Sequence, residues 1–245
     1  MTRPSAASPD GEPAFVLHSY PYRETSLLVE VFSRNFGRVG LVAKGAKRPR
    51  SPLRGLLQPF RPLLLGWSGR SELRTLCRAE GVGLPLPLAG TGMMCGFYLN
   101  ELLLKLLARH DAHERLFAAY REAIGGLAEA GEACDSVLRR FEKRLLGELG
   151  YAPTLDREAD TGQPLRADGR YVFVVERGPI PVERFEATGN SLECSGKTLL
   201  DVARDDYSDL ATLRQSKVLL RGIIGHYLGR QTLHSRRLLK ELRQL

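Results

Sequence analysis

Residues 14–44 read AFVLHSYPYRETSLLVEVFSRNFGRVGLVAK, three runs of apolar and β-prone residues separated by Pro, Ser, Asn and Gly. In the second run, Val29 and Val31 alternate with Glu30, the period of two that is typical of a half-buried antiparallel strand. The runs predict strands at 14–20, 26–32 and 38–44, and similar runs follow at 56–67 and 72–80. Five short strands within roughly 70 residues predict a small barrel such as the OB-fold, although an SH3-like barrel or a Greek-key sandwich fits the same spacing.

Beyond residue 80 the pattern changes from strands to helices. Residues 81–92, GVGLPLPLAGTG, are rich in Pro and Gly and mark a boundary. Helical periodicity then predicts helices at 93–109, 113–130, 135–149, 196–203, 210–228 and 235–242. The fold class is therefore α+β. We expect a disordered start at 1–13, a five-stranded OB-fold barrel at 14–80, a helical bundle at 81–150, a small β/loop module at 151–195 and C-terminal helices at 196–245 that complete the bundle.

The composition is that of a globular protein, with 43% hydrophobic and 26% charged residues. The longest apolar stretch, FYLNELLLKLLA, is interrupted by Asn100, Glu101 and Lys105, and the N-terminus lacks the apolar core of a signal peptide. The four cysteines lie 18, 39 and 60 residues apart, without the paired spacing of a zinc site. We therefore expect a soluble cytoplasmic protein with free cysteines.

The net charge of +8 is unevenly distributed along the chain. Residues 1–80 carry +7, residues 81–209 carry −6 and residues 210–245 carry +7. Residues 31–71 contain nine Lys or Arg and no acidic residue, whereas a merely solvated face mixes both signs. This asymmetry predicts a polyanionic partner, with nucleic acid favoured over an anionic membrane surface.

None of the motifs that resemble catalytic sites is complete. His110 and His113 in HDAHE (110–114) lack a third metal ligand and the H-E-x-x-H spacing. The sequence SGKT (195–198) resembles the end of a phosphate-binding loop, but Ser191 stands where that loop needs glycine. We therefore predict that the chain is not an enzyme and uses no metal and no cofactor.

The strongest binding pattern is a cluster of cations among Gly and Pro between the third and fourth predicted strands. Such a loop can follow a phosphate backbone, and aromatic residues in nearby turns can stack on bases. The predicted DNA contacts are Arg38, Lys44, Lys47, Arg48, Arg50 and Arg54, with Tyr22 and Phe36 as stacking residues. Phe60 and Trp67 lie in an apolar run, and we expect them in the core instead.

A second basic stripe lies on the predicted helix at 210–228. Arg214, Lys217 and Arg221 follow one another at steps of three and four, opposite an apolar side. No acidic residue occurs between residues 210 and 240. The stripe is therefore either a solvated face or an auxiliary surface that contacts nucleic acid or an acidic protein partner.

The ordered series of segments resembles the RecO family of DNA repair proteins. The segments are AFVLHSYPYRETSLLVEVFSRNFGRVGLVAKGAKR, LQPFRPLLL, FYLNELLLKLL, LRRFEKRLLGELGYAPTLD and LHSRRLL, which together cover the chain from about residue 14. The resemblance implies a bacterial, nucleoid-associated recombination mediator that binds single- and double-stranded DNA and promotes annealing. It also implies that the protein, with RecR, loads RecA onto DNA coated by single-stranded DNA-binding protein.

The chain departs from this family at one motif. Zinc-binding members carry C-x-x-C after the segment LGYAPTLD, but here Glu158 and Thr161 occupy those positions and Cys194 stands alone. The sequence therefore resembles the branch of the family without zinc.

The resemblance also implies that the helical region receives the acidic C-terminal tail of single-stranded DNA-binding protein. Such a tail needs an apolar groove beside a cation for its terminal carboxylate. On the predicted helix at 135–149, Leu138 and Phe141 would form the groove and Arg139 or Arg140 the anchor, with the 214–221 stripe as the second choice.

Two other classes of function stay open: an RNA-binding OB-fold protein, and an adaptor whose basic surfaces bind acidic protein tails.

Overall fold

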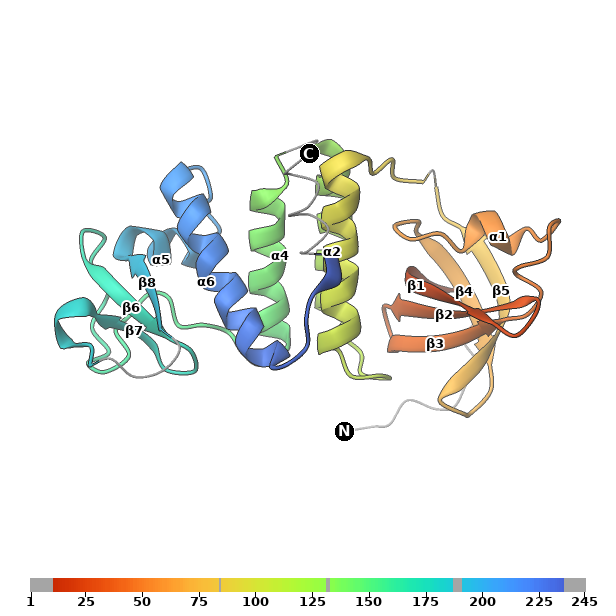
Figure 1. Ribbon diagram of the computed structural model, residues 1–245, viewed down its shortest axis with the longest axis horizontal. Coiled ribbons are helices and arrows are strands. Elements are labelled where there is room, and N and C mark those ends of the chain that lie inside the picture. The colour runs from red at the N-terminus through yellow and green to blue at the C-terminus, as the bar shows by residue number, and fades with distance from the viewer. Residues whose placement is uncertain (1–10, 84, 131–132, 187–190, 236–245) are drawn as a thin grey trace. The chain divides into compact units, whose positions relative to one another are not determined.

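A computed structural model describes residues 11–83, 85–130, 133–186 and 191–235 of the chain. The chain divides into two compact units, one made of Met1–Glu132 with Leu233–Leu245 and the other of Ala133–Thr232. A β-barrel with helices belongs to the first unit, and a small sheet with helices belongs to the second (Figure 1).

In the described residues, five strands close into a barrel. They are β1 (Glu12–Tyr22), β2 (Ser26–Ser33), β3 (Gly37–Ala43), β4 (Leu63–Ser68) and β5 (Leu73–Gly81). The order around the barrel is β1-β2-β3-β5-β4, and neighbours are antiparallel except β3 and β5, which run parallel. The predicted OB-fold barrel is confirmed.

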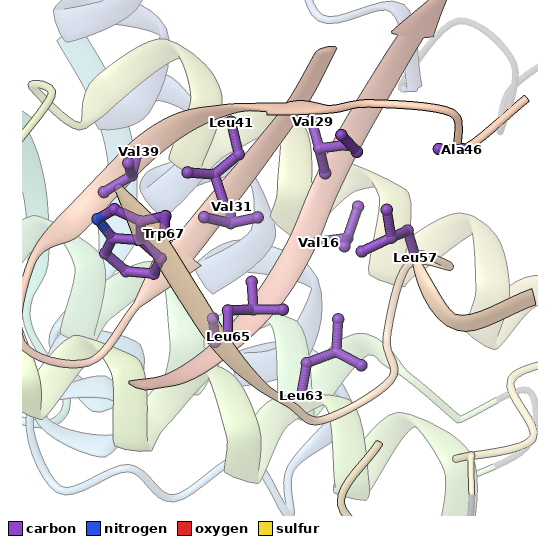
Figure 2. Close-up of a cluster of buried hydrophobic side chains, with 12 residues drawn as sticks. Val16, Val29, Val31, Val39, Leu41, Ala46, Leu57, Leu63, Leu65 and Trp67 are labelled. Atoms are coloured by element: carbon purple, nitrogen blue, oxygen red, sulfur yellow. The ribbon is translucent and has the colours of Figure 1, made fainter. Parts of the chain in front are cut away.

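The alternating pattern of the strands places one apolar face inside the barrel. Val29 and Val31 point into it together with Leu65 and Trp67 from β4, and all four are at most 1% exposed (Figure 2). Trp67 therefore belongs to the core, as predicted.

The structure corrects several predicted boundaries, among them the helix predicted at 93–109, which spans Gly90–Leu106. The run at 56–67 is not one long strand: helix α1 (Leu53–Leu56) precedes a loop, and β4 begins only at Leu63. Pro59 and Pro62 explain this difference, because proline lacks the N–H that a strand donates to its neighbour. The first strand begins at Glu12, inside the segment predicted to be disordered, and residues 1–10 lie outside the described residues.

Helices α2 (Gly90–Leu106) and α3 (Glu114–Glu129) cover part of the outer surface of β1 and β2 in the first unit. Phe15 packs against Phe117 and Tyr120 of α3, with ring centroids 5.5 and 5.1 Å apart. The buried Asn100 amide of α2 donates to the carbonyl oxygen of Leu17 over 2.9 Å. These contacts fix both helices to the barrel wall.

The second unit combines three antiparallel strands with three α-helices in its described residues. The strands are β6 (Arg170–Val174), β7 (Gly178–Pro181) and β8 (Ser191–Ser195), in the order β7-β6-β8. The helices are α4 (Asp135–Glu148), α5 (Gly196–Ala203) and α6 (Leu210–Leu228), with a 3-10 turn, η1 (Val182–Arg184), after β7.

Helices α4, α5 and α6 match the predicted ranges within one residue. α4 stops where expected because Gly150 adopts a φ of +82°, a conformation that glycine tolerates and other residues rarely adopt. The helix predicted at 235–242 lies, except for Ser235, outside the described residues.

Candidate nucleic-acid interface

Residues 44–54, which we call the basic loop, run from the end of β3 into the first residues of α1 on the barrel. Lys44, Lys47, Arg48, Arg50 and Arg54 are all exposed in this segment. The Lys47 amide donates to the carbonyl oxygen of Thr25 over 2.9 Å, and its ammonium donates to the carbonyl oxygen of Arg23 over 3.5 Å. The loop is therefore held against the β1–β2 turn while its cations face solvent.

The charge of the basic loop is not neutralised locally. Within the part of the chain that the structure describes, none of its five cations pairs with a carboxylate, whereas Arg34 pairs with Glu114 and Arg78 with Glu80 elsewhere in the same unit. Unpaired exposed cations on one loop attract a polyanion and can exchange its condensed counterions. The loop is thus the best candidate for a phosphate-binding surface.

Arg38 is not part of this surface, contrary to the sequence prediction. Its side chain is half-buried, and its Nη1 donates to the carbonyl oxygen of Leu104 in α2. Burial lowers the pKa of its guanidinium from the ordinary value, while nearby Glu30 acts in the opposite direction. Arg38 therefore connects β3 to α2 instead of facing solvent.

The predicted stacking residues have different environments. Tyr22 is partly exposed at the end of β1, with the Arg23 guanidinium 5.2 Å from its ring centroid. Phe36 is also partly exposed and packs edge-on against Trp67 of the barrel core, with ring centroids 5.4 Å apart, so its role in stacking stays a prediction. Phe60 is 6% exposed, which confirms its expected place in the core.

The predicted tail-binding face of α4 is not accessible. Leu138 and Phe141 are buried, and Arg139 is completely buried with its Nη2 2.8 Å from Oε1 of Glu142. Arg139 was predicted as a possible anchor for the tail, but Glu142, three residues later, pairs with its guanidinium inside the protein. Arg140 alone of the four is exposed, and its guanidinium lies 5.7 Å from the Tyr207 ring centroid.

The basic stripe on α6 is only partly free. Arg214 is exposed, Lys217 pairs with Asp135 over 3.1 Å, and Arg221 is half-buried. Arg214 lies between two exposed apolar side chains on successive turns, Leu210 and Val218, which are 69% and 59% exposed. This face therefore offers a cation flanked by apolar side chains.

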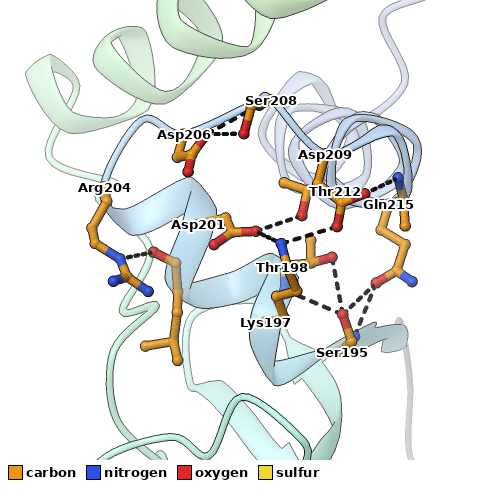
Figure 3. A network of polar contacts seen from close by, with 12 residues as sticks. Ser195, Lys197, Thr198, Asp201, Arg204, Asp206, Ser208, Asp209, Thr212 and Gln215 are labelled. Carbon is orange, nitrogen blue, oxygen red and sulfur yellow. Dashed lines mark hydrogen bonds and ion pairs between the residues drawn. The ribbon is translucent and has the colours of Figure 1, made fainter.

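The SGKT segment is a helix cap. The Ser195 hydroxyl accepts from the Thr198 amide over 3.2 Å at the start of α5, and the Lys197 ammonium pairs with Asp201 and Asp209 (Figure 3). The strand that precedes it, β8, is antiparallel to its neighbour. Both observations agree with the rejection of a phosphate-binding loop at the sequence level.

An ion-paired cluster includes Glu158 and Thr161, the two positions at which the sequence analysis found no C-x-x-C pair. The Thr161 hydroxyl donates to Glu158 over 2.6 Å, and the Arg184 guanidinium pairs with both Glu158 and Asp160. In the described residues, no group of three or more His, Cys, Asp or Glu side chains could hold a metal ion. Hydrogen bonds and ion pairs thus connect the 158–161 segment to η1.

We expect metal removal to leave the stability of the β/loop module at 151–195 unchanged. Dialysis against a strong chelator should not shift the midpoint of thermal unfolding, because the cluster contains carboxylates paired with a guanidinium and no thiolate. Elemental analysis after dialysis provides the second measurement. Stoichiometric zinc that survives dialysis, or a lower midpoint after its removal, would contradict this expectation.

Sequence reasoning missed one feature of the first unit, a cavity of about 720 Å³ lined by the outer faces of β1–β3 and by α2. Glu30 contributes a buried carboxylate to it, and Tyr20 contributes an exposed ring. A single acid between two core valines, as in the segment VEV, could have drawn attention to this position.

Comparison with known proteins places these features in a family. A family model described as "Recombination protein O N terminal" matches residues 11–85, and one described as "Recombination protein O C terminal" matches residues 89–237. A protein named DNA repair protein RecO from Nitrosospira multiformis is 57% identical over 236 residues, which cover 96% of this chain and 97% of that protein. Proteins of the same name from Aromatoleum aromaticum and Thiobacillus denitrificans are 54% and 49% identical over 96% and 98% of this chain.

None of the helices in the described part of the chain is both long and apolar enough to cross a lipid bilayer.

Proposed function

Since this chain belongs to the RecO family of DNA repair proteins, we propose that it binds single- and double-stranded DNA and promotes the annealing of complementary strands. In this proposal it acts with RecR to load RecA onto DNA coated by single-stranded DNA-binding protein, at the nucleoid in the cytoplasm. Membership in a family of DNA repair mediators also agrees with the prediction that the chain is not an enzyme.

The observation that carries the proposal is the uncompensated charge of the basic loop. Residues 14–80 serve as the DNA-binding domain, and the exposed cations of residues 44–54 contact phosphates without reading sequence. Contacts of this kind suit a mediator, which must act on DNA of any sequence. Annealing is then passive: the cations lower the repulsion between two strands, and base pairing supplies the free energy.

Binding measured at several salt concentrations tests this function. We expect the logarithm of the association constant to fall linearly with the logarithm of the salt concentration for single-stranded and duplex DNA. Annealing of complementary oligonucleotides should accelerate without ATP. Binding to RNA alone would favour an RNA-processing role. The absence of binding to DNA and RNA, or an affinity for DNA that does not depend on salt, would contradict the proposal.

The acidic tail of single-stranded DNA-binding protein needs a site other than the buried face of α4. We place it on the exposed face of α6, where Arg214 lies between Leu210 and Val218. Arginine can bind a terminal carboxylate through two parallel hydrogen bonds, and the two apolar side chains can cover those of the tail.

Replacing Arg214 with alanine is expected to weaken binding of a labelled tail peptide about ten- to a hundredfold, because a charge-assisted hydrogen bond contributes roughly 1.5–3 kcal/mol. Fluorescence anisotropy measures the affinity, and Arg204→Ala provides a control at an exposed arginine of the same unit. Equal affinity of Arg214→Ala and the parent protein would place the tail site elsewhere.

A further inference from the structure

The cavity beside the barrel is large enough for a nucleotide-sized ligand. Its volume of about 720 Å³ falls in the usual range of small-molecule sites. One wall is rigid, because the Asn100 amide donates to Leu17 and the Tyr120 hydroxyl donates to the Asn100 oxygen over 2.6 Å. Burial raises the pKa of Tyr120 and keeps its hydroxyl a donor. The cavity is thus preformed by the contacts that join α2 to β1.

One residue that lines this cavity, Glu30, has a carboxylate oxygen without a partner in the described residues. Glu30 is 4% exposed, and its Oε1 accepts from the Arg109 guanidinium, whereas its Oε2 is buried without a hydrogen-bond partner in the described residues. Nε of Arg38, in the same cavity lining, is also buried without a partner. Buried polar atoms are nearly always satisfied, so an unsatisfied carboxylate oxygen on a residue that lines a cavity indicates a ligand that donates a hydrogen bond.

A row of rings connects this cavity to the basic loop. The pairing of β1 with β2 shifts register between Val16 and His18, and beyond the shift His18, Tyr20 and Tyr22 follow at every second residue on one side of the strand. His18 and Tyr20 are exposed and line the cavity, with ring centroids 4.3 Å apart. Tyr22 precedes the β1–β2 turn, where Lys47 of the basic loop contacts the backbone of Arg23. The outer side of β1 therefore leads from the phosphate-binding cations to the cavity.

We propose that the cavity receives one unstacked base of the single strand held by the basic loop, and that Glu30 selects bases with an exocyclic amino group. This inference rests on the proposed function in DNA binding. The rings of Tyr22 and Tyr20 stack on the bases that lie between the basic loop and the cavity, since base–aromatic stacking does not depend on sequence. The amino group of cytosine donates to Oε2 of Glu30, as carboxylates accept from cytosine elsewhere. Thymine presents a carbonyl oxygen at that position, which the carboxylate repels.

Equilibrium binding of oligo(dC) and oligo(dT) of equal length tests the proposal. We expect the full chain to prefer oligo(dC) by roughly five- to a hundredfold at neutral pH, the discrimination of one good base contact. The salt dependence of both oligonucleotides tests phosphate binding independently. If both bind with the expected salt dependence but with equal affinity, the base pocket is wrong while the proposed function stands.

Two variants locate the preference within the molecule. Glu30→Gln keeps an acceptor for Arg109 but turns an amide donor toward the cavity, so the preference for oligo(dC) should disappear or reverse. Glu24→Gln removes the same charge from an exposed position in the β1–β2 turn and should retain the preference. A preference that persists in Glu30→Gln, with unchanged thermal unfolding, would overturn the role of Glu30.

A third variant addresses the ring row without perturbing the buried carboxylate. Tyr20 is 45% exposed, so Tyr20→Ala should fold normally and weaken oligo(dC) binding about fivefold or more through lost stacking. Unchanged affinity in Tyr20→Ala would overturn the route along β1. Free dCMP is expected to bind far more weakly than oligo(dC), and equal affinity would make the cavity a mononucleotide site and contradict the proposal.

Discussion

DNA binding is expected to fall on the order of a thousandfold at about 0.1 M salt when Lys47, Arg48 and Arg50 are replaced together with glutamate. The three side chains are exposed on one loop and unpaired in the described structure, so each can release condensed counterions from a phosphate. Loss of three phosphate contacts should also reduce the slope of log affinity against log salt by about three. Titration of labelled single-stranded DNA at several salt concentrations measures both quantities.

A control for net charge accompanies this triple variant. Arg115, Arg121 and Arg230 are exposed outside the basic loop, and their joint replacement with glutamate changes the net charge equally. This control should lose much less affinity and keep most of the salt slope. An equal loss in the two triple variants would show that overall charge, and not the basic loop, governs binding.

Replacing Arg139 with methionine is expected to destabilise the second unit by about 3–5 kcal/mol, because it leaves the buried Glu142 carboxylate without this cation. Domains are commonly stable by only about 5–15 kcal/mol, so the loss is a large share of the total. Urea unfolding followed by circular dichroism measures the change.

The double variant Arg139→Met/Glu142→Leu separates charge from packing. Replacing both members of a buried ion pair with apolar residues of similar size is often neutral, so stability should return close to that of the parent. A double variant as unstable as the single one would mean that the guanidinium contributes through its shape and packing rather than through its charge.

The strands and helices were largely predictable because their patterns are local. The alternation of Val29, Glu30 and Val31 predicts a strand, and the helices of the second unit follow from apolar residues at steps of three and four. The run at 56–67 was misread because apolar composition alone does not distinguish a strand from a short helix and loop, although Pro59 and Pro62 could have shown the break.

The environment of individual side chains was less predictable because it depends on residues distant in sequence. Arg38 has the same local sequence character as the cations of the basic loop, but Leu104, 66 residues later, supplies its hydrogen-bond acceptor. The burial of Arg139 could have been predicted from the local sequence, because Glu142, only three residues later, can pair with a buried guanidinium. Exposure of Lys47 and Arg48, in contrast, agrees with a loop rich in Gly, Pro and charged residues, from which the small Ala46 side chain packs into the barrel core.

The hydrogen bonds between the Glu101 carboxylate and residues 234 and 235 limit when the first unit can be completed during translation. The carboxylate accepts hydrogen bonds from the amides of His234 and Ser235 and from the Ser235 hydroxyl, over 2.6–2.9 Å. Domains generally fold as they emerge, with the N-terminal one first. The barrel and α2, with the ion pair between Glu101 and Lys105, can therefore form early in translation, but His234 and Ser235 are translated only after the entire second unit, Ala133–Thr232. The first unit therefore cannot be completed until the residues that follow the second unit have been translated.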